Sequence, residues 1–167
     1  MDPNILFNWS VDDPSPTLSC QAGLYTGSFT GFYASAITVV GVPIPVFGDV
    51  NLTLQQSANG EFYTISNGSV HGTADGILAQ YDCKLTGTLD CSTKKLEDGL
   101  IDCNYCVGVF AGDSGICLGV EGHFVGPVSA DYDAANQSFE NGDWKGKEGA
   151  DAAVFGGSGH WTAAYGP

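Results

Sequence analysis

The chain has 167 residues, with 19 acidic side chains, five lysines and no arginine, which gives a net charge of −14. Such a charge repels polyanions, and the arginine forks that grip phosphate groups are absent. We therefore do not expect nucleic acids or anionic membrane surfaces to be binding partners. A hydrophobic content of 43% excludes global disorder, and 24 glycines spread through the chain disfavour long helices.

Residues 1–19 differ from the remainder of the chain. The segment 12–17 is polar and contains two prolines, which is typical of a linker or an extended arm. An apolar cluster precedes it and is expected to dock on the domain or on a neighbouring subunit: Ile5, Leu6, Phe7 and Trp9. The start of the chain has no charged segment followed by a long apolar run, so we expect a mature domain from which an export signal has been removed. Residues 20–167 are predicted to form a single β-domain.

From Cys20 onward a glycine, any residue and an aromatic residue recur as a triplet. Residues i and i+2 of a strand share one face, so the aromatic ring is expected to cover the bare backbone of glycine. Repeated triplets predict a strongly curved sheet, either a closed barrel or a tight sandwich. The seven triplets begin at Gly23, Gly27, Gly31, Gly60, Gly122, Gly142 and Gly159.

Short turn signals divide the domain into alternating segments. Residues 58–60 predict a tight hairpin between strands at 50–56 and 62–66, and Asn67-Gly68 predicts another turn. Residues 92–95 separate strands at 83–91 and 96–103, and residues 133–136 separate strands at 128–132 and 138–144. The sequence thus predicts an all-β antiparallel meander of about eight to ten strands.

Six cysteines in a glycine-rich β-pattern predict three disulfides and an extracytoplasmic protein. The first expected pair is Cys106 with Cys117, which would close the loop at residues 107–116. The alternative is a zinc site formed by Cys103, Cys106, Cys117 and His123, since the first spacing suits zinc. The cysteines are Cys20, Cys83, Cys91, Cys103, Cys106 and Cys117.

The succession of motifs at 23–29, 65–68, 87–93, 142–144 and 159–161 resembles uncharacterised secreted or lipoprotein glycine-rich β-domains of the kind common in myxobacteria. It is also loosely similar to avidin-type and lipocalin-type barrels. The first resemblance implies a β-domain outside the cytoplasm and implies no activity.

Several patterns suggest chemistry, and each also has a structural explanation. Residues 112–115 spell Gly-Asp-Ser-Gly, as in trypsin-like nucleophiles, but a flexible loop explains them equally well. Three histidines, at 71, 123 and 160, are expected on outward-facing strand positions rather than at a metal site. Asp131, Asp133 and Asn136 suggest calcium or a hairpin turn. Glu121, Asp131, Glu140 and Glu148 include no obvious pair for glycoside hydrolysis.

No arrangement of nucleophile and base stands out, so the sequence predicts a non-catalytic binding or surface-interaction module without a cofactor. Carbohydrate or another cell-surface ligand is the expected partner, with Trp144, Trp161, Tyr25 and Tyr33 as ligand-binding residues. A self-assembling structural surface protein, associating through its N-terminal arm, is one alternative. A hydrolase or metal-dependent enzyme of unrecognised type is the other.

Overall fold

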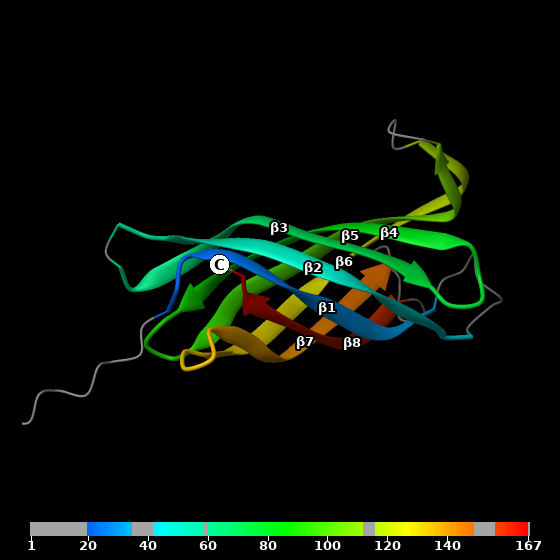
Figure 1. The fold of residues 1–167 in the computed structure, drawn as a ribbon. Helices are drawn as coiled ribbons and strands as arrows, with labels where there is room; N and C mark the ends of the chain where they lie inside the picture. The colour runs from blue at the N-terminus through cyan, green and yellow to red at the C-terminus, as the bar shows by residue number, and fades with distance from the viewer. Residues whose placement is uncertain (1–19, 35–41, 59, 112–115, 149–155, 167) are drawn as a thin grey trace, which may run out of the picture.

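The protein is an eight-stranded antiparallel β-barrel, as the computed structural model in Figure 1 shows. The structure describes residues 20–34, 42–58, 60–111, 116–148 and 156–166. The predicted arm at residues 1–19 therefore lies outside the described residues. Within the described ranges there is no helix, and so none that could cross a membrane. The strands are β1 (Gly23–Ala34), β2 (Ile44–Gln56), β3 (Phe62–Ala74), β4 (Ala79–Asp90), β5 (Lys95–Ala111), β6 (Ile116–Asp133), β7 (Ser138–Glu148) and β8 (Gly156–Tyr165).

Each strand pairs with the next along the chain, and β8 returns to pair with β1. This confirms the predicted meander and decides for a barrel over a sandwich. Full closure leaves the barrel wall without an edge strand. The predicted turns at 58–60, 92–95 and 133–136 lie between successive strands.

The turn predicted at Asn67-Gly68 is wrong, because β3 continues through it. The pairing of β3 shifts there against both neighbours, which makes the segment a β-bulge. Gly68 is needed for close approach of the neighbouring strand, since a Cβ there would clash with the Leu85 carbonyl oxygen, and the local signal does not separate this use of glycine from a turn. The observed strands are accordingly longer than those predicted.

Register shifts recur on six consecutive strand pairs, from β2–β3 to β7–β8. The bulge between β5 and β6 includes Asp98 at φ 50°, and the bulge between β7 and β8 includes Asn141 at φ 49°. A bulge bends its strand and increases the local twist. The repetition coils the sheet so that β8 meets β1.

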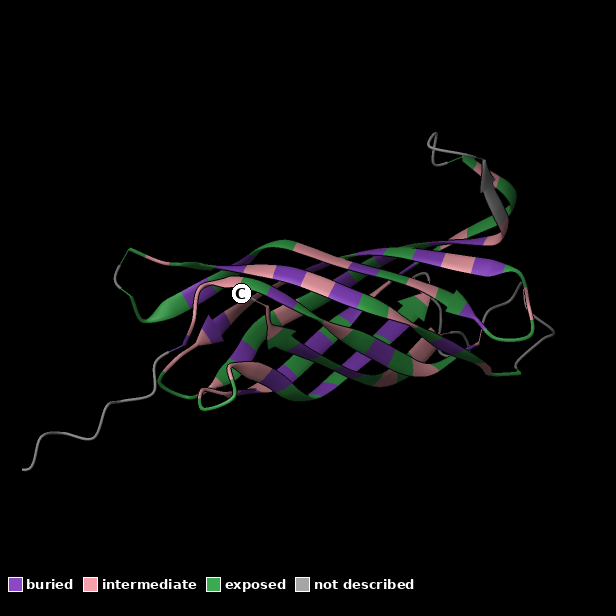
Figure 2. Ribbon diagram, in the orientation of Figure 1, coloured by how far each residue is buried: buried purple, intermediate pink, exposed green. Residues whose placement is uncertain are grey.

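Side chains alternate between the interior and the solvent along the barrel wall, as the colour bands of Figure 2 show. On β1, Gly27, Phe29, Gly31 and Tyr33 share the inward face. The rings of Phe29 and Trp144 cover glycines one and two strands away, so that a Cβ at Gly31 on β1 would lie 2.6 Å from Trp144 on β7. Within the barrel wall, glycines of these triplets are therefore covered by inward aromatic rings that fill the space glycine leaves, whereas Phe62 of the triplet at Gly60 is exposed.

All six cysteines form disulfides, and the expected bond between Cys106 and Cys117 is confirmed. The other two bonds join Cys20 to Cys91 and Cys83 to Cys103. The pair on β4 and β5 comes from facing positions of the ladder. Three disulfides are typical of proteins in an oxidising, extracytoplasmic environment.

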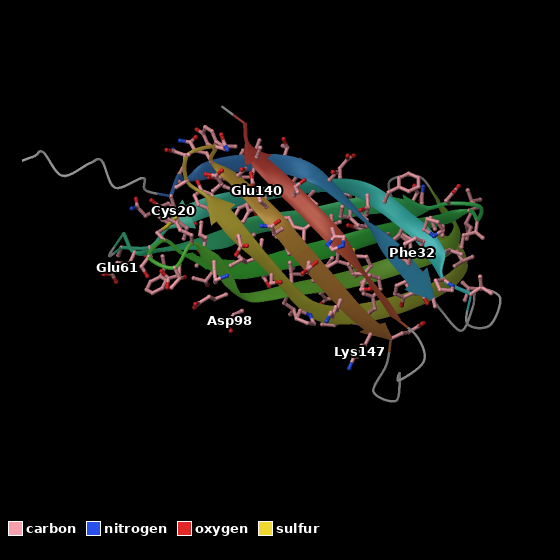
Figure 3. The ribbon with its side chains drawn as sticks, turned by 90° about the horizontal axis from the view of Figure 1, so that it is seen from below. Cys20, Phe32, Glu61, Asp98, Glu140 and Lys147 are labelled. Carbon is pink, nitrogen blue, oxygen red and sulfur yellow. A yellow bond between two sulfur atoms is a disulfide. The ribbon has the colours of Figure 1, made fainter. Side chains whose placement is uncertain are left out.

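The barrel has two distinct ends, which Figure 3 marks with Cys20 and Phe32. The Cys20 end is closed by residues 20–22. There the Tyr25 hydroxyl donates to the Gln21 carbonyl at 2.7 Å, and the Tyr63 hydroxyl donates to the Cys20 carbonyl at 3.1 Å. The disulfide to Cys91 ties the same segment to the turn after β4. The opposite end, called the Phe32 end below, is where Phe32 and Glu148 lie.

Candidate functional site

The four aromatic residues predicted to bind ligand all lie inside the barrel: Trp144, Trp161, Tyr25 and Tyr33, exposed by 4% or less. Trp144 donates its Nε1 proton to the Thr30 carbonyl at 3.1 Å, and Trp161 donates to the Ser129 carbonyl at 3.1 Å. The two tryptophans are therefore core residues and do not form an exposed aromatic platform for a ligand. These rings face inward because they lie two residues after glycines of the inward face, and residues i and i+2 of a strand share one face.

The interior of the barrel has no room for a ligand among the residues described. Two small voids occur, one beside Val70 and Trp161 and the other beside Tyr81 and Phe124, each of about 10 Å³. That volume is about what a single water molecule needs. These two voids are too small for a ligand of drug size, whereas the outer surface of the described residues offers larger hollows.

At the Phe32 end, tyrosine hydroxyls surround the carboxylate of Glu148. Tyr105 donates to Oε1 at 2.5 Å and Tyr33 to Oε2 at 3.5 Å, while the ring of Tyr81 packs against both tyrosines. Burial, reinforced by Glu148, raises the pKa of the Tyr33 phenol, and burial also raises the pKa of Tyr81. Burial thus favours the neutral phenols of Tyr33 and Tyr81, and with Tyr105 they form one buried aromatic cluster beside Glu148.

Two shallow grooves on the outer surface are large enough for a ligand, each with a volume of about 530 Å³. That size falls within the roughly 300–1,000 Å³ of ordinary small-ligand sites. The first groove crosses β2, β3 and β4, the second crosses β7, β8, β1 and β2, and Phe47 lines both. The first is lined by Phe47, Gly48, Asp49, His71, Gly72, Thr73, Gln80, Tyr81 and Asp82. The second is lined by Thr30, Gly31, Phe32, Pro45, Val46, Phe47, Asp143, Trp144, Lys145, Ser158, Gly159 and His160.

Two exposed aromatic rings stand at these grooves. Phe32 is 59% exposed and Phe47 is 48% exposed. In the ladder, Phe32 faces Pro45 and Phe47 faces Thr30, so the two phenylalanines are diagonal neighbours on β1 and β2. Diagonal neighbours lie about 7–8 Å apart, within reach of aromatic side chains, and both rings are on the outer face of the wall. Figure 3 shows Phe32 on the outside of the barrel.

Each groove also contains a histidine paired with an aspartate on the adjacent strand. His160 Nδ1 lies 2.7 Å from Asp143, and His71 Nδ1 lies 3.3 Å from Asp82. Asp49 faces His71 from the other side, on β2. These pairs are exposed, which agrees with the predicted outward histidines. They present hydrogen-bond donors and acceptors beside the aromatic surface.

The zinc alternative is wrong, because Cys103, Cys106 and Cys117 are all in disulfides. The remaining histidine of that set, His123, lies 2.7 Å from Asp102 on the outer surface. Across the described part of the chain, no three histidine, cysteine or acidic side chains are arranged to hold a metal ion.

The acidic residues considered for calcium instead stabilise a turn. Asp133 accepts hydrogen bonds from the backbone of Ala135 and Asn136, which lowers the pKa of its carboxyl group. Asp131 accepts from Lys95 at 2.9 Å and from Asn141, and its pKa is also lowered. The Gly-Asp-Ser-Gly segment at 112–115 lies outside the described residues.

Comparison of the chain with protein-family models, with curated proteins and with solved structures finds no match to any of them. The structural class of the protein is therefore described from its fold and its surface. The protein is a disulfide-linked, eight-stranded antiparallel β-barrel with a filled interior and two outer grooves.

Sequence analysis missed Phe32 and Phe47 as candidate site residues, although the signal was present. Phe32 lies between Gly31 and Tyr33, which share the inward face, so the alternation of a strand puts Phe32 outside. Phe47 likewise follows the inward Val46. The signal was therefore an aromatic residue at a strand position whose side chain faces outward.

Proposed function

We propose that the protein is a non-catalytic binding module, secreted or held at the cell surface, that recognises a neutral oligosaccharide through its two outer grooves. The observation that carries the proposal is the exposed pair Phe32 and Phe47, placed where the grooves meet, on a barrel whose interior is filled.

The chemistry of the grooves supports a sugar ligand. The apolar face of a pyranose ring packs on an aromatic ring, while its hydroxyl groups need donors and acceptors nearby. The grooves supply both, with polar groups that include Asp49, Gln80 and Ser158 beside the phenylalanines.

The charge of the grooves supports a neutral ligand. The first groove contains two aspartates and no lysine, and Lys145 of the second lies beside Asp143. On a chain of net charge −14, an anionic glycan would meet repulsion at both.

The direct test is binding of the protein to an array of neutral and anionic oligosaccharides. Calorimetry then measures the affinity for the best ligand. Phe32→Ala and Phe47→Ala are each expected to weaken binding at least tenfold without changing the melting temperature. Phe62→Ala is the matched control, because Phe62 is also exposed but lies at the Cys20 end.

Two results would reject the proposal. One is the absence of binding to any neutral glycan, or binding that both groove variants retain in full. The other is release of smaller sugars from a bound glycan by the pure protein, which would show catalysis.

A further inference from the structure

The far ends of β5 and β6 extend beyond the barrel wall and bend away from it, at the upper right of Figure 1. Pairing of β5 with β4 ends at Val107, whereas pairing of β5 with β6 continues to Ala111 and Ile116. On the other side of β6, pairing with β7 begins only at Phe124. Among the described residues, no strand pairs with the β7 side of 116–123.

The disulfide between Cys106 and Cys117 lies on the inner side of this bend. In the ladder Cys106 faces Glu121, four residues away from Cys117, and four residues of a flat strand span about 13 Å. The Cα atoms of the two cysteines are only 5.6 Å apart, so the extension must curl toward its cysteine face. The opposite face is consequently convex.

The convex face of β6 is apolar and exposed. Ile116, Leu118 and Val120 occupy alternate positions, with exposed fractions of 60%, 62% and 49%. They have the parity of Phe124, which points into the barrel. Within the barrel wall, the side chains on this face of β6 are buried. In the extension, the outward bend exposes the side chains of the same face.

The same segment carries no charge, although the chain as a whole carries −14. Proteins usually protect exposed edge strands with charged residues, because an open edge is a template for another strand. Residues 116–120 have none, and Glu121 is the first acidic residue after them. Two copies of this acidic chain would repel one another over most of their surfaces, so contact is favoured where charge is missing.

We propose that two copies of this chain associate by antiparallel pairing of their β6 edges over Ile116–Val120, centred on Leu118. Two-fold symmetry then places Ile116 against Val120 of the partner subunit, and Leu118 against Leu118 of the partner subunit. The pairing joins two barrels through one continuous sheet and places the two apolar strips side by side on one face of it, where their side chains contact each other.

The association is measured on the intact three-disulfide protein by sedimentation velocity over a concentration series. The wild-type protein is expected to form a dimer, and Leu118→Lys is expected to weaken dimerisation at least tenfold with an unchanged melting temperature. The matched control is Leu24→Lys, since Leu24 is also exposed on a strand but lies at the Cys20 end. Hydrogen exchange should show protection of amides in 116–120 that increases with protein concentration.

A pair of charges tests the antiparallel register itself. Ile116→Lys alone and Val120→Glu alone should each give monomers, while the double variant should recover the dimer through two salt bridges between subunits. Parallel pairing or a non-specific apolar contact would give no such recovery. A wild-type monomer at every concentration, equal disruption by Leu24→Lys, or a double variant that stays monomeric would overturn the proposal.

Discussion

Replacing Trp144 with alanine tests whether the aromatic residues of the glycine triplets hold the barrel together. The ring is 3% exposed, packs against Phe29 and Phe124 at centroid distances of 6.3 and 6.2 Å, and covers Gly31 and Gly159. Alanine leaves a void at a point where glycines provide no side chain that could fill it.

The expected loss follows from these contacts. Removal of a buried tryptophan side chain costs about 3–5 kcal/mol, and loss of the hydrogen bond to the Thr30 carbonyl contributes about 1 kcal/mol of it. For a domain of this size, about 4 kcal/mol corresponds to a fall in melting temperature of roughly 10 °C. Trp144→Phe should lose less, because most of the packing is kept.

The assay is guanidinium unfolding of the oxidised protein, followed by tryptophan fluorescence and far-ultraviolet circular dichroism. Phe32→Ala is the surface comparison and should change the free energy of unfolding by less than about 0.5 kcal/mol. A loss below about 1 kcal/mol for Trp144→Ala would refute the packing argument. It would also restore Trp144 as a candidate for a surface role.

Two further predictions concern the interior. Because burial raises the pKa of Tyr25, Tyr33 and Tyr81 above the usual 10, the folded state favours the neutral phenols. Their contribution is complete below pH 10 and is lost as the pH rises toward the folded pKa. Ultraviolet titration should therefore show at least three of the seven tyrosines ionising only as the protein unfolds at high pH, and early ionisation of all seven would contradict this. Gly31→Ala should destabilise the barrel by several kcal/mol, because its Cβ would meet Trp144 and the Ser158 carbonyl. Gly166→Ala, with open space around it, is the control, and equal unfolding curves for the two variants would show that the contact is relieved at little cost.

Much of the fold could be predicted from local patterns. Alternation and turn residues identified a β-meander, and the even number of cysteines identified three disulfides. These predictions succeeded because strand parity and turn chemistry are properties of short segments. The bond between Cys106 and Cys117 was also accessible, since the two cysteines are only 11 residues apart.

The candidate site depended on relations between strands, which short segments do not contain. Trp144 and Trp161 are flanked by charged or polar residues in sequence, which suggested a surface position, yet their parity is that of the covered glycines. The second groove exists because β7, β8, β1 and β2 are neighbours, and only closure of the barrel brings β8 beside β1.

The sequence by itself determined the β class, the oxidised cysteines and the acidic surface, since these follow from composition and local periodicity. The tertiary structure decided which face of each strand is inside, that large side chains are buried there, and that Phe32 and Phe47 are diagonal neighbours on the outer wall. The physical reason is register. A shift of one residue exchanges the two faces of a strand, and register is fixed only when all eight strands pair at once.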